Sequence, residues 1–396
     1  MDLNKLIGLA EDIKEQIVIW RRDFHQHPET GYQEFRTSGI VADHLQSLGL
    51  EVRRNVGKTG VVGILRGEEP GPTIGLRADM DALPIQDLKT VDYCSKIPGK
   101  GHLCGHDAHT SMLMGAAQLL VNLGKPKRGN IKFVFQPAEE GLAGAKAMMD
   151  DGVLENPRVD AMAGLHVFPA LPTKSIAVTK GVAFASADSI AIKIIGKGGH
   201  AARPHEAVDA ITVSAQVISA LQHVASRLVD PLDPVVVTIG KIQGGYMGTA
   251  IAPEVEMVGT VRTLSPTLRA KMPELIETII RGVTQSFGAD YEFKYNIGYP
   301  VVVNNEDMVD FLTQTSERLF GEKRWEFVKP STGGEDFAFY SEVVPSVFFR
   351  LGVSNEQEYT SYPLHHPKFD LDENALPYGV AMLSAIALSF LSDSSH

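Results

Sequence analysis

One short segment of the chain concentrates side chains that can bind a metal ion. Residues 101–110 read G-H-L-C-G-H-D-A-H-T, so Cys104 lies among His102, His106 and His109. Cys104 and His106 are two residues apart, and in an extended turn both side chains can face one point. Thiolate and imidazole ligands suit zinc, manganese, cobalt or nickel. A turn with a buried cysteine and surface histidines has the same pattern, so this segment alone leaves both interpretations open.

Two adjacent glutamates follow a predicted buried strand, Ile131–Gln136. The sequence P-A-E-E-G places Glu139 and Glu140 just beyond the carboxyl end of that strand. In an open parallel sheet, ligands bind at such ends. One carboxylate can then bind a metal while the other takes a proton from water that the metal activates. For an isolated pair of glutamates, a solvated helix start is the alternative.

Other segments also place metal-binding side chains after apolar runs. A-M-A-G-L ends in His166, and T-I-G-L is followed by Asp79 and Asp81. A proline-bracketed loop near the C-terminus holds His365 beside a second histidine. Each of these residues has an ordinary explanation by itself, as a polar cap or a surface loop. Together, at the ends of several strands, they predict a metal site.

The number of candidate ligands predicts two metal ions, because it exceeds one tetrahedral set. A thiolate can bridge two ions, and ions about 3.5–4 Å apart can hold a water between them and polarise a carbonyl. Asp79 and Asp81 would orient the neighbouring ligands. A purely structural zinc site is disfavoured, because such sites are closed and often contain several cysteines. The predicted ligands are Cys104, His106, Glu140, His166 and His365.

The elements that must position these residues alternate between helix and strand, which predicts an α/β domain with a largely parallel sheet. Apolar spacing predicts helices, and short apolar runs predict strands. The predicted helices are 3–22, 34–48, 110–123, 305–320 and 374–392, and the predicted strands are 60–65, 73–76, 131–136, 159–167 and 346–351.

The order of the predicted helices and strands changes near residue 184, which predicts a second, inserted domain. Its order is β-α-β-β-α-β, the ferredoxin-like arrangement. The predicted elements are strand 189–195, helix 206–228, strands 235–239 and 255–263, helix 268–287 and strand 290–295. We therefore expect a larger domain of residues 1–183 and 297–396, interrupted by a smaller domain of residues 184–296.

Composition limits the classes of protein that fit. The 396 residues carry 37 Lys+Arg and 48 Asp+Glu, a formal charge of −11, with 44% hydrophobic residues. These values are globular, and an acidic chain without a basic stripe argues against nucleic-acid binding. Two cysteines, Cys94 and Cys104, exclude a disulfide-stapled fold. Acids near the start, and no run approaching about 18 apolar residues, predict a soluble cytoplasmic protein without a membrane span.

The order of six motifs resembles a known family across essentially the whole chain. They are R-A-D-M-D-A-L-P, H-L-C-G-H-D-A-H-T, P-A-E-E-G, G-L-H-V-F-P, G-K-G-G-H-A-A-R-P-H and L-H-H-P-K-F. The chain is similar to the binuclear metallo-amidohydrolases: hippurate hydrolases, N-acyl-amino-acid amidohydrolases and indole-acetyl-amino-acid hydrolases. These are relatives of the aminoacylases and metal carboxypeptidases.

The resemblance implies a role for each residue of the predicted metal site. Cys104 would bridge two divalent ions of zinc, manganese, cobalt or nickel, with the other four ligands completing them. Glu139 would be the general base that takes a proton from water and passes it to the leaving amine. Asp79 falls where more distant relatives carry a ligand histidine, a function that His106 takes over here. Asp81 would orient a neighbouring ligand.

The inserted domain resembles the lid and dimerisation domain of the family, which implies a homodimer or higher oligomer. Its His200 would stabilise the oxyanion of the transition state; from the residues alone, a helix-capping role is the alternative. Arg262, and the backbone N–H groups of Gly333 and Gly334, would meet a substrate carboxylate; from the residues alone, an exposed strand residue and a plain loop are the alternatives. Thr249 stands where many relatives carry asparagine, and its side chain has a shorter reach.

We therefore expect a metal-dependent hydrolase that cleaves the amide bond of N-acyl-L-amino acids. A carboxypeptidase or dipeptidase of the same family, acting on short peptides, is the first alternative. A non-catalytic relative that binds a ligand in the cleft is the second. The intact Glu139 and the five ligands argue against it.

Overall fold

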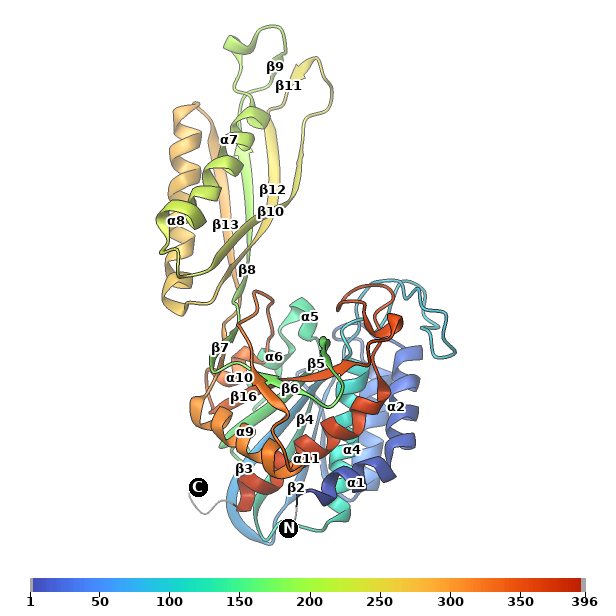
Figure 1. The fold of residues 1–396 in the computed structure, drawn as a ribbon. Coiled ribbons are helices and arrows are strands. Elements are labelled where there is room, and N and C mark those ends of the chain that lie inside the picture. The colour runs from blue at the N-terminus through green and yellow to red at the C-terminus, as the bar shows by residue number, and fades with distance from the viewer. Residues whose placement is uncertain (1–2, 393–396) are drawn as a thin grey trace. The chain divides into compact units, whose positions relative to one another are not determined.

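The computed structural model describes residues 3–392, which form two compact units. Unit 1 comprises the chain up to Ala183, Val303–Lys329 and the chain from Asp336 onwards. Unit 2 comprises Phe184–Val302 and Pro330–Glu335. The chain thus leaves unit 1 and returns to it, which is the organisation of an inserted domain (Figure 1).

Unit 1 is built on one eight-stranded, mostly parallel sheet in the order β1-β2-β4-β3-β5-β16-β6-β15. β3 pairs in parallel with β4 and β5, and β5 pairs in parallel with β16. β1, β2 and β4 are joined by antiparallel pairings at one side of the sheet. The strands are β1 Glu51–Val56, β2 Gly60–Arg66, β3 Glu69–Asp79, β4 Arg128–Gln136, β5 Ala161–Pro172, β6 Ile176–Val178, β15 Trp325–Phe327 and β16 Ser346–Ser354.

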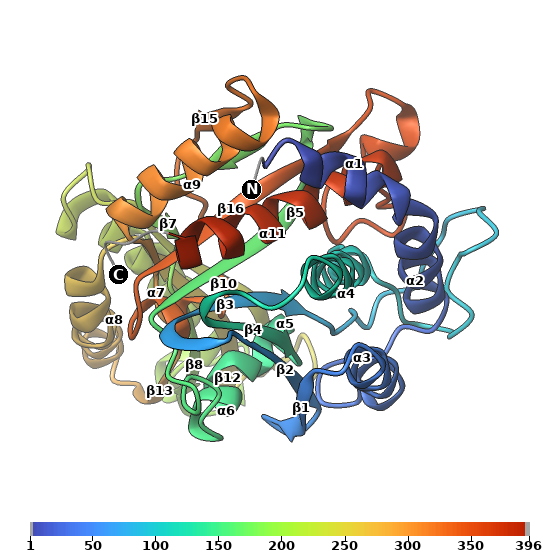
Figure 2. The same cartoon turned by 90° about the horizontal axis from the view of Figure 1, so that it is seen from below.

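Helices cover both faces of this sheet. α4 (His106–Asn122) and α11 (Leu376–Ser392) pack over β3, β4 and β5, whereas α6 (Gly144–Asp150) contacts β4 from the other side (Figure 2). Both α4 and α11 are buried over most of their length, which makes them the centre of the apolar core. The remaining helices of unit 1 are α1 Lys5–Asp12, α2 Lys14–Gln26, α3 Phe35–Ser47, α5 Glu139–Leu142, α9 Glu306–Phe320 and α10 Ala338–Ser341, with short 3₁₀ turns at Glu358–Thr360 and Glu373–Ala375.

The parallel register brings the predicted site segments to one edge of the sheet. Asp79 at the end of β3 pairs with Gln136 at the end of β4, so the turn carrying Glu139 starts beside Asp79. On β5, His166 pairs with Arg350 of β16. This edge is the place where parallel α/β sheets bind ligands.

Unit 2 has a four-stranded antiparallel sheet in the order β10-β12-β8-β13, with α7 and α8 on one face (Figure 1). The chain order β8-α7-β10-β12-α8-β13 is the predicted ferredoxin-like arrangement. The elements are β8 Ala187–Ile195, β9 Gly199–His200, η1 Pro204–Glu206, α7 Ala210–His223, η2 Val224–Leu228, β10 Val235–Gly244, β11 Ala250–Ile251, β12 Glu254–Thr263, α8 Pro266–Ser286 and β13 Asp290–Tyr299. Strands β7 (Gly181–Phe184) and β14 (Val302–Asn304) lie where the chain passes from one unit to the other.

Side-chain caps explain where several helices begin. The Asp209 carboxylate accepts from the N–H groups of Ile211 and Thr212 at the start of α7, and Ser265 caps α8 before Pro266. Asn305 caps α9 in the same way, and the helix ends before Gly321, which has φ +70°. Each cap satisfies N–H groups that lack a partner within the helix.

Several predicted boundaries differ from the structure, and three of these differences bear on the site or on the division into units. The helix expected over 3–22 is two helices, since the chain breaks at Ile13 (φ −105°, ψ 7°). The helix expected from residue 110 already begins at His106, so one predicted ligand lies in its first turn. β13 continues its pairing with β8 as far as Tyr299, which keeps residues 297–302 with unit 2 rather than with the larger domain.

One helical segment of the described chain, Glu373–Ser392, is long and apolar enough to cross a membrane by length and composition alone. It is mostly buried inside unit 1, where α11 packs against α4 and α9. Its apolar character is therefore explained by its place in the core.

Candidate metal centre

The turn before α4 brings Cys104 and His106 to the edge of the sheet. Gly105 between them has φ +86°, a conformation that favours glycine. A Cβ at this position would lie 2.3 Å from Cγ2 of Val167, so the close approach to β5 also requires glycine. The Gly105 of the motif thus allows the two candidate ligands to lie close to the strand that carries His166.

Four of the predicted ligands form a chain of contacts centred on the thiol of Cys104. Its Sγ lies 3.4 Å from Nε2 of His166 and 3.3 Å from Nε2 of His365. Nε2 of His365 lies 3.4 Å from Oε1 of Glu140. Cys104, His106 and His166 form one group whose candidate ligand atoms lie within 4.8 Å of one another, and Cys104, Glu140 and His365 form a second. The thiol belongs to both groups, as a bridging ligand would.

The two glutamates are held by a turn whose backbone is fixed by buried carboxylates. Asp81 accepts from the N–H groups of Glu139 and Glu140, at 2.9 and 3.0 Å. Glu34 accepts from the N–H of Ala138 at 2.8 Å, and Asp336 accepts from Ala145 at 2.9 Å. Ala138 has φ +54°, so this turn is held in a conformation that an alanine seldom adopts.

Asp79 and Asp81 face the histidines of α4. Nδ1 of His106 lies 3.4 Å from Oδ1 of Asp81, and its Nε2 lies 3.7 Å from Oδ2 of Asp79. Asp79 also accepts a 2.6 Å contact from His109 and a 2.6 Å hydrogen bond from Arg77. The Val167 N–H donates to Nε2 of His109, so Nδ1 of His109 carries the proton that Asp79 receives.

The electrostatics of this region fit a site for divalent cations. Burial opposes charge on His106, yet Asp79, Asp81 and Glu140 raise its pKa to about 10. Burial raises the pKa of the Cys104 thiol well above its usual value, and Glu140 and Glu139 add to this effect. Without a cation, the carboxylates therefore hold protons on groups that would be metal ligands.

Unpartnered polar atoms point to the same conclusion. Within residues 3–392, the ring nitrogens of His106 and Oε1 of Glu140 make no hydrogen bond of good geometry, although each has an oppositely charged group at 3.4–3.7 Å. Buried polar atoms without partners are rare because they are costly. The thiolate, imidazole and carboxylate donors present here are the types that bind zinc and other transition metals. The residues therefore fit bound metal.

The remaining predicted site residues lie in unit 2, in two groups. His200 on β9 pairs with Ala250 of β11, and the N–H of Ala201 donates to the carbonyl of Thr249. Arg262 on β12 lies beside Gly334, where a Cβ would be 2.8 Å from the arginine Nη1. The N–H of Gly333 donates to the hydroxyl of Ser331. Their roles toward a substrate stay predictions.

Sequence reasoning left several supporting residues unassigned. His109 belongs to the same histidine-rich segment and could have been included from that position. Arg77, Glu34 and Asp336 gave no comparable signal, because their partners lie far away in the sequence. They fix Asp79 and the turn of the two glutamates.

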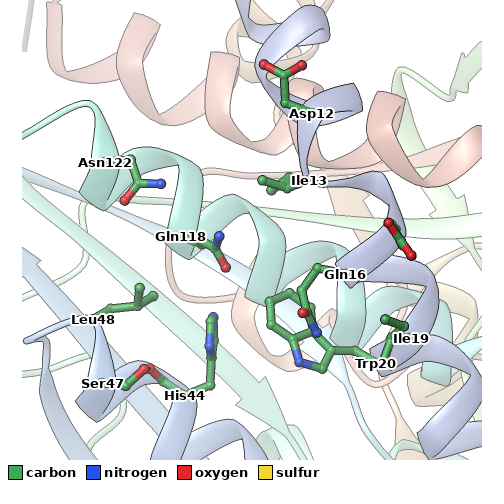
Figure 3. A pocket seen from close by; sticks show the side chains of 11 residues that line it. Asp12, Ile13, Gln16, Ile19, Trp20, His44, Ser47, Leu48, Gln118 and Asn122 are labelled. Carbon is green, nitrogen blue, oxygen red and sulfur yellow. The ribbon is translucent and has the colours of Figure 1, made fainter.

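A separate pocket of about 670 Å³ lies between α2, α3 and α4 and contains none of the predicted site residues (Figure 3). The ring centroids of Trp20 and His44 lie 4.6 Å apart, and the two rings pack edge-on. Burial lowers the pKa of His44, which keeps this imidazole neutral. This histidine is therefore a packed aromatic group away from the metal centre.

Comparison with known proteins places this arrangement in a family. Residues 75–389 match the model of peptidase family M20/M25/M40. The chain belongs to the M20 family. It is 44% identical to an N-acyl-L-amino acid amidohydrolase of Geobacillus stearothermophilus, over 78% of this chain and 83% of that protein. It is 38% identical to thermostable carboxypeptidase 2 of Saccharolobus solfataricus, over 98% of this chain and 99% of that protein.

A solved M20 structure agrees with the fold and the chemistry. The Bacillus subtilis YXEP protein, a dinuclear metal binding peptidase, superposes with a TM-score of 0.83 at 35% identity, covering 96% of this chain and 99% of that one. The chain is therefore an enzyme, a metal-dependent amide hydrolase of the M20 family.

Proposed function

We propose that this M20 enzyme hydrolyses N-acyl-L-amino acids, releasing a carboxylate and a free amino acid. The observation that carries the proposal is the position of Glu139 and Glu140 on one rigid turn beside the Cys104 cluster. Such a pair lets one carboxylate bind metal while the other takes a proton from water. The named amidohydrolase relative supports the same substrate class.

In this proposal two divalent ions would be held by the five predicted ligands. Zinc, manganese, cobalt and nickel are the candidates for these ions. When bound, the ions polarise the substrate carbonyl and activate water. Glu139 would take a proton from the attacking water and pass it to the leaving nitrogen, while Asp81 keeps the backbone of both glutamates in place.

Unit 2 supplies the remaining groups in this proposal. His200 would stabilise the negative charge that develops on the carbonyl oxygen. Arg262, with Gly333 and Gly334 next to it in this unit, would bind the carboxylate of the amino acid. Thr249 would offer a single hydroxyl to the substrate.

The test measures metal content and then hydrolysis of N-acetyl and N-benzoyl amino acids, before and after chelation. We expect about two ions per chain and turnover that chelation abolishes. Glu139→Gln should keep the metal but lower kcat by about 10²–10⁴-fold, because the base is lost. Near-normal turnover in this variant would remove Glu139 from that role.

A carboxypeptidase activity on short peptides is the second candidate, and the similarity to thermostable carboxypeptidase 2 favours it. Dipeptides assayed beside the acylated amino acids separate the two functions. A higher kcat/KM for dipeptides would replace the first proposal. Bound metal without turnover of either class would favour a ligand-binding relative.

We also propose that the protein is cytoplasmic and forms a homodimer through unit 2. Both cysteines, Cys94 and Cys104, are free thiols, which suits a reducing compartment. Unit 2 exposes several large apolar side chains that a partner could cover: Ile242, Tyr246, Met247, Val258 and Ile297. Light scattering after size-exclusion chromatography tests the dimer, and cell fractionation tests the location.

A further inference from the structure

A network of buried charges lies beside the metal centre, and Arg21 on α2 is at its middle. The side chain of Arg21 is fully buried. Its Nε donates to Asp107 at 2.9 Å, its Nη2 to Asp370 at 2.6 Å and its Nη1 to Glu373 at 3.0 Å. One guanidinium therefore joins three carboxylates from two distant segments.

Each of these two segments carries predicted metal ligands. Asp107 directly follows His106 in the first turn of α4. Asp370 lies five residues after His365, on the segment that leads to the last helix. The two segments also meet directly, because the N–H of His365 donates to the carbonyl of Leu103 at 2.7 Å.

Further contacts restrain both carboxylates. Asp107 accepts a 2.7 Å contact from Nδ1 of the buried His25. The hydroxyl of Tyr93 donates to Asp370 at 2.7 Å, and the Arg21 guanidinium lies 4.8 Å from the centre of the Tyr93 ring. A planar guanidinium binds carboxylates in a defined geometry, which a flexible ammonium does not.

Stability alone is a poor reason for such a network. The free energy lost when an arginine and its carboxylates are removed from water is about as large as the free energy gained from their attraction. Apolar residues of similar volume often stabilise a fold equally well. The geometric consequence is more specific, since the network connects the segment of His106 with the segment of His365.

We propose that Arg21 is a positioning residue of the metal centre, which keeps the His106 segment and the His365 segment in register so that both can bind the same pair of ions. The inference rests on the proposed metal site. The helix α2 contributes no ligand to the proposed set, but through Arg21 it would affect metal affinity.

The experiment compares Asp370→Asn with the matched control Asp372→Asn in the full chain. Asp372 is a buried carboxylate two residues further on, and its oxygens accept from Thr173 and Asn374. Co²⁺ is the probe, because competition with a coloured chelator gives its affinity and its visible spectrum reports the thiolate geometry. We expect Asp370→Asn to weaken Co²⁺ binding by roughly 10- to 100-fold and to change the spectrum.

The control variants separate positioning from general stability. Asp372→Asn should keep the wild-type affinity and spectrum even if its Tm falls. Arg21→Lys should bind Co²⁺ more weakly than wild type, because an ammonium cannot reproduce the planar contacts. Lys132→Met removes another buried cation, which donates to carbonyls of Val153, Glu155 and Pro157, and should leave Co²⁺ affinity unchanged.

Two results would overturn the inference. One is wild-type Co²⁺ affinity in Asp370→Asn, and the other is an equal loss of affinity in Asp370→Asn and Asp372→Asn. Both would leave the proposed metal site intact. If the wild-type protein binds no Co²⁺, the proposed metal site itself fails, which is a distinguishable outcome.

Discussion

Replacing Glu34 with glutamine should remove part of the dependence of stability on pH. Glu34 is fully buried, where its carboxyl accepts from the Ala138 N–H at 2.8 Å and from the Thr59 hydroxyl at 2.6 Å. Burial raises the pKa of Glu34 to about 7, the hydrogen bond from Thr59 partly opposes this, and the charge of Asp81 adds to the increase. Glutamine resembles the protonated acid in shape and in hydrogen bonding.

The direction of this pKa shift determines how the stability of the protein changes with pH. The folded state favours the protonated form, so the stability that Glu34 contributes is complete below its unfolded pKa, about 4.5. It is lost as the pH rises through the folded pKa, about 7. With these two values, linkage predicts that the free energy of unfolding of the wild type falls by about 2.5 kcal/mol between pH 5 and pH 8 because of Glu34. The Glu34→Gln variant should lack this decrease.

The assay is urea unfolding of both proteins at pH 5, 6, 7 and 8, with chelator present throughout so that metal binding does not contribute. Half-buried His44, whose pKa is lowered, has the opposite effect: its contribution to stability is lost as the pH falls below its unfolded pKa. This contribution is common to both proteins. Such contributions cancel in the difference between the unfolding free energies of wild type and Glu34→Gln. A difference that stays constant over this range would refute the assignment of a raised pKa to Glu34.

Two further substitutions test the turn that carries the glutamates. Gly144→Ala should destabilise the enzyme by about 3 kcal/mol or more, because a Cβ would lie 1.6 Å from the carbonyl oxygen of Pro137. Gly8→Ala in α1, where nothing lies within 4 Å, should stabilise it slightly in the same thermal denaturation experiment. Asp81→Asn leaves one acceptor oxygen for the two N–H groups of Glu139 and Glu140, so kcat should fall by roughly tenfold or more at little change in KM. A tenfold rise in KM at unchanged kcat would contradict this reading.

The strands that carry the site, and the largely parallel sheet, could be predicted from the sequence because short apolar runs and their polar ends are local signals. β3, β4 and β5 are parallel neighbours, so Asp79, Glu139 and His166 reach one edge by topology alone. Cys104 lies at this edge through the turn before α4, in which Gly105 has φ +86°. The ferredoxin-like unit could also be predicted from the sequence, since each of its strands and helices carries its own apolar pattern.

The supporting charges could not be predicted in this way. A charged residue in an amphipathic helix is expected on the solvent side, yet Arg21 is fully buried. Its partners at Asp107 and Asp370 lie 86 and 349 positions away along the chain. Glu34 and Asp336 are similar, since each binds the 138–145 turn from a distant segment. No local periodicity encodes such contacts.

Bound cations should also change the behaviour of these buried acids. The pKa of Glu34 is raised in part by the negative charge of Asp81, which itself holds the two glutamates. Positive charge placed beside Glu140 and His106 would attract the ionised form of nearby carboxylates and so lower their pKa. The loss of stability attributed to Glu34 should therefore be smaller, and be complete at lower pH, in the metal-loaded enzyme than in the chelated one, because its folded pKa then lies closer to the unfolded value. Metal binding and ionisation of Glu34 should thus be thermodynamically linked, since each favours the other.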